Sequence, residues 1–236
     1  MSKKKSLLIF GGTGLIGSSI VSKFTENNWR VISISRKKKD SKNHICWDVI
    51  NDSNIDKLLL EIKKKGPFDS VCWAQGENFN DNVYNFDQEK HLEIYKTNVF
   101  YILKSLNLLL KLQALNKGAR LCILGSIWQH ISRQDKLSYG ISKSALHGLV
   151  LSLANDMAND GFLVNAVLPG VIDTPMTHNN LTKEQIKNVK KSTNFMKLTE
   201  LRDVVNTVYF LSSNENTGVT GEFIKVDLGY SSVRII

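Results

Sequence analysis

The chain has 236 residues and carries 31 Lys and Arg against 22 Asp and Glu, which gives a formal net charge of +9. The length suits one α/β domain, and no window approaches the roughly 18–20 apolar residues of a membrane span. The basic clusters have no interleaved aromatic residues and no nucleic-acid motif. The charge therefore predicts solubility and a phosphate-bearing ligand near Arg36, with neither nucleic acid nor membrane as a partner.

The N-terminus reads MSKKKSLLIFGG, a basic start followed by an apolar run at residues 7–10. A secretory signal needs about 7–15 apolar residues, so we interpret the run as a buried first strand and expect a cytoplasmic protein. The three cysteines, Cys46, Cys72 and Cys122, lie in short apolar runs without a CxxC pair. We expect buried thiols, with neither a disulfide framework nor a metal site.

Short β-branched runs alternate with longer helical patterns along the whole chain. Strands are predicted at residues 7–10, 30–35, 44–48, 68–74, 120–125, 162–168 and 222–226. Helices are predicted at residues 14–27, 54–65, 87–115, 137–159, 182–191 and 200–212. This alternation predicts one α/β domain over residues 1–236, a doubly wound parallel sheet of about seven strands with helices on both faces. The polar segment 173–180 is expected to be a loop and a candidate lid.

A glycine-rich loop, GGTGLIG, follows the first predicted strand and precedes the first predicted helix. The glycines at 11, 14 and 17 leave room for a pyrophosphate, and a helix N-terminus offers it free N–H groups. The alternative is a plain glycine-rich turn, but the position between strand and helix favours nucleotide binding. The expected contacts are Gly11, Thr13, Gly14, Leu15 and Ile16.

The end of the second predicted strand selects between the two dinucleotides. An acidic residue there favours NAD, whereas an arginine accommodates the 2′-phosphate of NADP. The chain reads ISISRKKKD, with Ser35 and Arg36 at the decisive positions and Asp40 further along the loop. We predict NADP(H) as the preferred cofactor, with NAD(H) possible; the alternative is an ordinary basic turn.

Tyr139 and Lys143 are four residues apart in the segment SYGISK, within the predicted helix 137–159. Residues at this spacing lie on one helix face, so the phenol has a cation at its side. An adjacent ammonium lowers the pKa of a phenol from about 10 toward working pH and prepares it for proton transfer. Ser126 lies thirteen residues earlier, at the end of a predicted parallel strand, where such sheets build their sites. The alternative is an ordinary surface pair.

These motifs together resemble the short-chain dehydrogenase/reductase family of Rossmann-type enzymes, over essentially the whole chain. The resemblance rests on the glycine loop together with Asn98, Ser126, Tyr139 and Lys143, and on PGVIDT at residues 169–174. The C-terminal portion is most similar to bacterial β-ketoacyl carrier-protein reductases. The resemblance implies a catalytic set in which Ser126 positions a carbonyl oxygen, Tyr139 is the acid/base, Lys143 also holds the nicotinamide ribose, and Asn98 anchors a relay water.

The same resemblance implies further cofactor contacts outside the glycine loop. An acidic residue after the third strand contacts the adenine, small residues border the adenosine, and the segment after the sixth strand grips the carboxamide. These contacts fall on Asp48, Val49, Ala74, Gly76, Pro169, Gly170, Ile172 and Thr174.

The sequence also departs from the family pattern. The middle glycine of the loop is displaced, the usual Asn-Asn-Ala-Gly reads WAQG at residues 73–76, and the late VDGG-like motif reads VDLG at 226–229. None of these changes touches the acid/base residues. Trp128, Gln129 and His130 form a bulky polar wall after the catalytic serine, so a modified sugar or polyol and a β-ketoacyl thioester both stay open as substrates.

The sequence therefore predicts an NADP(H)-dependent oxidoreductase that interconverts a ketone and a secondary alcohol. The alternative is a catalytically silent NADP(H)-binding regulatory protein, which the complete acid/base set disfavours. The resemblance also implies a homodimer or homotetramer that packs through the segments 87–115 and 137–159, both rich in leucine.

Overall fold

Seven parallel strands form one sheet in the order β3-β2-β1-β4-β5-β6-β7, so the predicted fold class is confirmed. The computed structural model describes residues 4–36, 40–48, 50 and 55–233. The strands are β1 (Ser6–Phe10), β2 (Arg30–Ser35), β3 (His44–Cys46), β4 (Phe68–Trp73), β5 (Leu115–Leu124), β6 (Leu163–Pro169) and β7 (Phe223–Val226).

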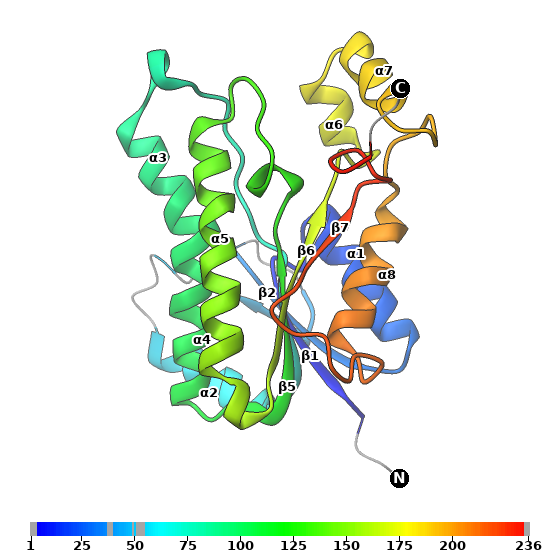
Figure 1. Ribbon diagram of the computed structural model, residues 1–236. Coiled ribbons are helices and arrows are strands. Elements are labelled where there is room, and N and C mark those ends of the chain that lie inside the picture. Colours follow the sequence, from blue (N-terminus) through cyan, green and yellow to red (C-terminus); the bar gives the residue numbers. More distant parts are fainter. Residues whose placement is uncertain (1–3, 37–39, 49, 51–54, 234–236) are drawn as a thin grey trace.

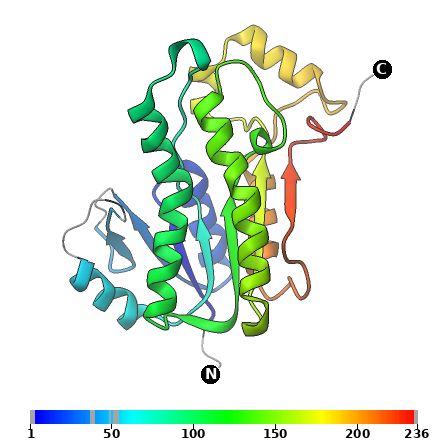
Figure 2. The same cartoon turned by 60° about the vertical axis from the view of Figure 1, so that its left-hand side comes forward.

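Helices cover both faces of the sheet and make three layers (Figures 1 and 2). One face is covered by α1 (Leu15–Glu26) and α8 (Leu201–Ser212), and the other by α2 (Ile55–Lys65), α3 (Gln88–Tyr95), α4 (Tyr101–Lys111) and α5 (Leu137–Asp156). Successive side chains of a strand point to opposite faces. In β1, Leu7 and Ile9 accordingly join the apolar cluster under α1 and α8, while Leu8 and Phe10 join the cluster on the other side.

The strand order reverses between β1 and β4, because β2 and β3 lie on one side of β1 and the later strands on the other. In such sheets ligands bind in the crevice outside the carboxyl ends of the strands at this switch point. Two short helices, α6 (Pro175–Asn180) and α7 (Lys183–Lys191), lie above this end (Figure 1). The fold thus places the loops after β1, β4, β5 and β6 around one location.

The structure corrects three expectations. The predicted helix 87–115 is α3 and α4 joined by a π-helical turn, Lys96–Phe100, and it ends at Lys111, after which Gln113 takes a φ of 52° and β5 begins. The predicted loop 173–180 contains α6, which begins because the Thr174 hydroxyl accepts from the Thr177 N–H and Pro175 fits the first turn. Cys46 is exposed, unlike the buried Cys72 and Cys122.

The described part of the chain contains no helix that is both long and apolar enough to cross a bilayer.

Candidate active site

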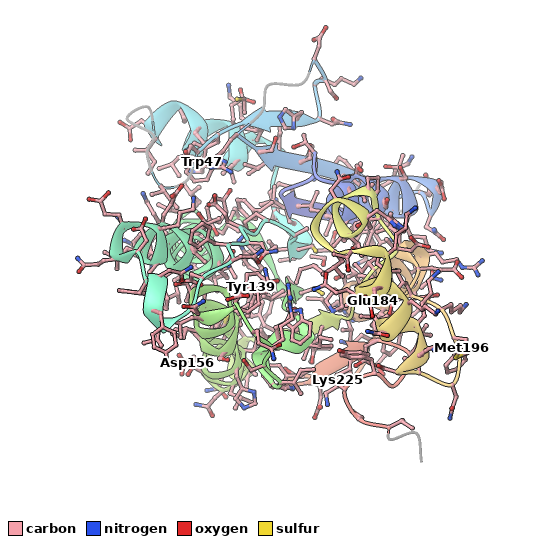
Figure 3. All side chains as sticks on the ribbon, turned by 90° about the horizontal axis from the view of Figure 1, so that it is seen from above. Trp47, Tyr139, Asp156, Glu184, Met196 and Lys225 are labelled. Atoms are coloured by element: carbon pink, nitrogen blue, oxygen red, sulfur yellow. The ribbon has the colours of Figure 1, made fainter. Side chains whose placement is uncertain are left out.

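A cavity of about 670 Å³ opens at the carboxyl ends of the central strands. Its walls come from the glycine loop, the segment after β4, the ends of β5 and β6, one face of α5, and α6 with α7. Seen from above, Tyr139 of α5 lies toward the middle of the molecule, on the side of α5 that faces α7, the helix that carries Glu184 (Figure 3). The candidate lid segment 173–180 thus forms part of the cavity wall through Thr174 and Thr177, and Leu181 and Gln185 extend the wall beyond it.

The glycine loop forms a tight turn between β1 and α1. Gly11 has a φ of +81°, and a Cβ there would lie 2.6 Å from the backbone nitrogen of Gln75; a Cβ on Gly17 would lie 2.1 Å from the Gly11 carbonyl oxygen. Glycine is therefore required at both positions. The first turn of α1 has no side-chain cap at Gly14, so its N–H groups face the cavity beside Leu15 and Ile16. Gly11 and Thr13 support this turn but do not line the cavity.

At the predicted adenosine end, the charges of Arg36 and Asp48 both act on the buried phenol of Tyr101. Arg36 is exposed at the end of β2, and the Asp48 carboxylate accepts from the backbone N–H of Ile50 at 3.0 Å. Ser35 is buried and its hydroxyl lies 3.4 Å from the Nε2 of His44, so this contact links β2 to β3. None of the three lines the cavity. Val49 and residues 37–39 lie outside the described residues.

Ser126 and Tyr139 both line the cavity. Ser126 caps the short helix Ile127–Gln129 by accepting from the Trp128 N–H at 3.3 Å. Burial raises the pKa of Tyr139, and the Ser126 hydroxyl opposes that rise. The net shift is therefore upward because burial dominates, whereas the sequence predicted a net lowering of the phenol's pKa. The Lys143 ammonium lies 5.8 Å from the ring centroid, and a backbone carbonyl holds it.

Lys143 is one turn of α5 beyond Tyr139 and only 4% exposed. Its ammonium donates to the carbonyl of Leu124 at 2.9 Å, at the end of β5. Burial lowers the pKa of Lys143 to about 8. An ammonium without a carboxylate partner inside a cavity can exchange its proton near neutral pH, which is unusual for lysine.

Asn98 lies in the π-helical turn and is 1% exposed. Its side chain accepts from the Glu77 N–H at 2.8 Å, donates to the Glu77 carbonyl at 3.0 Å, and donates to the Ser142 hydroxyl at 2.9 Å. It does not line the cavity, but a Cβ on Gly76 would lie 3.4 Å from its Oδ1 and 3.6 Å from the Lys143 Nζ. Gly76 therefore keeps open the space between the amide and the ammonium.

The segment after β6 supplies the wall opposite α5. Pro169, Gly170, Ile172 and Thr174 all line the cavity, together with Ala74 and Gly76 from the segment after β4. Gly170 approaches β7 closely, because a Cβ there would lie 2.7 Å from the Cβ of Asp227.

The segment at residues 73–76, which departs from the family pattern, makes contacts of its own. The Trp73 indole stacks on Phe10 at 5.8 Å and donates to the Ser105 hydroxyl at 2.8 Å, so it ties β4 to α4. Gln75 lines the cavity, and its buried side-chain amide has no hydrogen-bond partner among the described residues. Buried amides are normally hydrogen-bonded, so this one is suited to a ligand.

Sequence reasoning missed two cations at the cavity, Arg133 and Lys136. Lys136 is 6% exposed, and its ammonium lies 5.5 Å from the Tyr139 ring centroid. The one available signal was its position three residues before Tyr139, next to the predicted helix start.

Comparisons with known proteins agree with this geometry. The sequence profile described as Enoyl-(Acyl carrier protein) reductase matches residues 16–231. A 3-oxoacyl-(acyl-carrier-protein) reductase, FabG, of Buchnera aphidicola is 28% identical over 96% of this chain and 97% of its own length. A short chain dehydrogenase family protein of Francisella tularensis superposes with a TM-score of 0.87 at 25% identity, over 98% of this chain and 100% of that one.

A third protein, ElxO with NADP bound, has the same fold, with a TM-score of 0.86 at 24% identity over 98% of this chain and 100% of that one. The profile, the full-length relative and the shared architecture identify the chain as a member of the short-chain dehydrogenase/reductase family of oxidoreductases.

Proposed function

We propose that this protein is an NADP(H)-dependent oxidoreductase that interconverts a ketone and a secondary alcohol, with Tyr139 as the acid/base. The observation that carries the proposal is the convergence of Ser126, Tyr139 and Lys143 on the cavity that the glycine loop also lines. We further propose that residues 1–236 act as one dinucleotide-binding domain in the cytoplasm.

The cavity fits a dinucleotide on three structural grounds. Gly14, Leu15 and Ile16 of the glycine loop line the cavity, the first turn of α1 lacks a side-chain cap, and the Gln75 amide has no partner among the described residues. A pyrophosphate would lie on Gly14, Leu15 and Ile16, as anions do at helix N-termini. When bound, the nicotinamide ring donates or accepts the hydride.

In the direction of reduction, the raised pKa of Tyr139 keeps its phenol protonated at neutral pH. The phenol is then able to donate its proton to the carbonyl oxygen as that oxygen gains charge. The Ser126 hydroxyl donates a hydrogen bond to the same oxygen and fixes its position. In the reverse direction the same phenol receives the alcohol proton after losing its own.

The ammonium of Lys143 lies beside the phenol, so it stabilises the phenolate formed in this step. With a pKa of about 8, Lys143 is also able to pass a proton on. Asn98 is a positioning residue, because it joins the segment after β4 to Ser142, the residue before Lys143.

The preference for NADP(H) rests on Arg36, the exposed cation at the end of β2. A guanidinium matches the geometry of a phosphate, whereas NAD(H) would present a hydroxyl there. Asp48 also acts on Tyr101, and its carboxylate is suited to the adenosine rather than to the 2′-phosphate.

The cavity favours a polar substrate. Besides Asn78 and Asn80, which bind Lys136, its wall carries Gln134 from a loop, and Gln185 and Asn188 from α7. These three amides suit a sugar or polyol better than a long acyl chain, because an apolar chain would leave them unpaired. A β-ketoacyl thioester is the second candidate, because the Buchnera relative is named as a 3-oxoacyl reductase.

We also propose a homodimer or homotetramer formed through the face of α3, α4 and α5. Large apolar side chains on this face are exposed, with Phe100 at 47% and Leu103 at 43%. Contiguous exposed apolar groups of this kind mark protein–protein contacts. Light scattering of wild type and Phe100→Asp tests this, and a wild-type monomer would contradict it.

The function is tested by titrating the protein with NADPH and NADH, and then measuring NADPH oxidation against sugar ketones and acyl thioesters. Tight NADPH binding with turnover supports the proposal. Tight binding without any turnover would instead support a silent NADP(H)-binding regulator.

A further inference from the structure

Two cations, Arg133 and Lys136, lie in the substrate half of the cavity, on the loop that leads into α5. Neither belongs to the proton-transfer set described above. Lys136 immediately precedes the first turn of α5, which places it on the Tyr139 side of the cavity. Arg133 stacks on the Trp128 indole, with its Cζ 5.8 Å from the ring.

Lys136 is held between two loops by neutral oxygens. Its ammonium donates to the side-chain oxygens of Asn78, at 2.6 Å, and Asn80, and more weakly to the Phe79 carbonyl at 3.4 Å. It forms no ion pair with a residue that the structure describes. Buried lysines are rare unless they are paired, so a buried ammonium surrounded by neutral acceptors needs an explanation.

Arg133 provides the second charge and brings five N–H donors. Its one contact with a described side chain is the stacking on Trp128, and it forms no hydrogen bond or ion pair with a described residue. The two cations repel each other, since Arg133 and burial together lower the pKa of Lys136 to about 8. Two like charges facing one cavity destabilise the protein alone and are stabilised by an anion between them.

The nearby carboxylates do not fill this role. Asp81 and Asp135 favour the charged form of Lys136, but Asp81 accepts from the N–H and hydroxyl of Ser138, and Asp135 accepts from Asn82 at 2.8 Å. Glu77 is the acidic residue on the described cavity lining, and it pairs with Lys90 at 3.3 Å. The charges within the cavity are therefore predominantly positive.

We propose that Arg133 and Lys136 bind an anionic group of the substrate, so that the substrate is a small polar ketone or alcohol carrying a carboxylate or phosphate near the reacting carbon. The inference rests on the proposed function and names its substrate class. Because Lys136 lies beside the Tyr139 ring, the anion binds within a few bonds of the carbonyl that Tyr139 protonates. The guanidinium fork of Arg133 suits either anion.

Two matched substrate pairs test the proposal and distinguish a carboxylate from a phosphate as the anionic group. Acetoacetate and its neutral amide report on a carboxylate, and dihydroxyacetone phosphate and dihydroxyacetone report on a phosphate. We expect kcat/KM for at least one anionic member to exceed that of its neutral partner at least tenfold. In Lys136→Met and in Arg133→Met this preference falls at least tenfold through KM, while the neutral partner changes less than twofold.

Controls separate recognition from folding. Lys136→Arg restores part of the preference, and Lys63→Met, which removes an exposed lysine of α2, leaves it unchanged. Arg133→Met keeps the experiment decisive if Lys136→Met fails to fold, because Arg133 holds no other described residue by hydrogen bonds. Equal loss for anionic and neutral partners, or no anionic preference in wild type, overturns the proposal.

A binding measurement keeps this inference separable from the proposed function. Calorimetric titration of the protein–NADP complex with acetoacetate and with glycerol 3-phosphate needs no turnover. Binding of one anion that weakens at least tenfold in Arg133→Met supports the anion site even if no ketone is reduced. Absence of binding by both anions overturns it even if neutral ketones are reduced.

Discussion

The catalytic end of the cavity is tied together by buried hydrogen bonds, whereas the adenosine end is built from more exposed side chains. At the catalytic end, Lys143 and Asn98 are 4% and 1% exposed and bond to Leu124 and to Glu77, on other elements of the fold. At the adenosine end, Arg36 is exposed at a strand end. The proposed proton-transfer geometry is therefore fixed by long-range contacts, while the proposed preference for NADP(H) depends on one local charge.

The largest effect on cofactor binding is expected at the glycine loop. Gly11→Ala places a Cβ 2.6 Å from the Gln75 backbone nitrogen at a φ of +81°. We expect roughly 100-fold weaker NADPH binding by fluorescence titration, on the order of 3 kcal/mol, since both strain and overlap oppose it.

Gly14→Ala is the matched control for that variant. The atom nearest to a Cβ there is the Gly11 oxygen at 3.5 Å, an ordinary contact. Its binding should change less than fivefold. Equal losses in both variants would show that the loop lacks the proposed close approach.

Replacing the positive charge of Arg36 should change only the preference between NADPH and NADH. Arg36→Asp is expected to weaken NADPH binding by about 10- to 100-fold, since a charge-assisted contact contributes about 1.5–3 kcal/mol. NADH binding should stay the same or improve, and the fold should be intact. If NADPH and NADH weaken equally, Arg36 does not read the 2′-phosphate.

At the catalytic end, the buried ammonium of Lys143 predicts a pH-dependent stability. Its pKa of about 8 lies below the ordinary 10.5, so between these values the unfolded chain binds more protons. The free energy of unfolding of wild type relative to Lys143→Met should therefore rise between pH 8 and 10.5, on the order of 2 kcal/mol. Below pH 8 the difference should be constant. Urea unfolding at several pH values measures it, and a flat difference throughout would contradict the burial effect.

The smallest effect is expected at Trp73, outside the reacting groups. Trp73→Phe keeps an aromatic ring against Phe10 but removes the hydrogen bond to Ser105. We expect a loss of about 1–2 kcal/mol in unfolding free energy. Turnover should change less than twofold, and a larger loss of turnover would connect Trp73 to the site.

The parts of the fold visible in the sequence are those that short-range patterns encode. Buried apolar runs predicted the strands 7–10 and 30–35, and periodic segments predicted the helices 182–191 and 200–212, each within two residues of the structure. The π-helical turn at Asn98 was not predictable, because its side chain bonds to the backbone of Glu77, twenty-one residues away. Helix α6 has six residues, too few to show a period.

The candidate site likewise contains residues that local sequence spacing predicts and residues whose position depends on distant contacts. Gly14, Ser126, Tyr139 and Lys143 were predicted from spacing, and the structure lines one cavity with them. The cavity position of Lys136 depends on Asn78 and Asn80, more than fifty residues earlier, so no local pattern revealed it. The raised pKa of Tyr139 likewise follows from burial in the assembled fold, which a motif does not encode.

The most direct test of the central claim is to compare Tyr139→Phe with wild type in NADPH binding and in single-turnover reduction of the best ketone. The phenyl ring keeps the packing and removes only the proton donor. We predict an unchanged dissociation constant for NADPH and a rate that falls by roughly 10²–10⁴. A rate within tenfold of wild type, with binding intact, would contradict the assignment of Tyr139 as the acid/base.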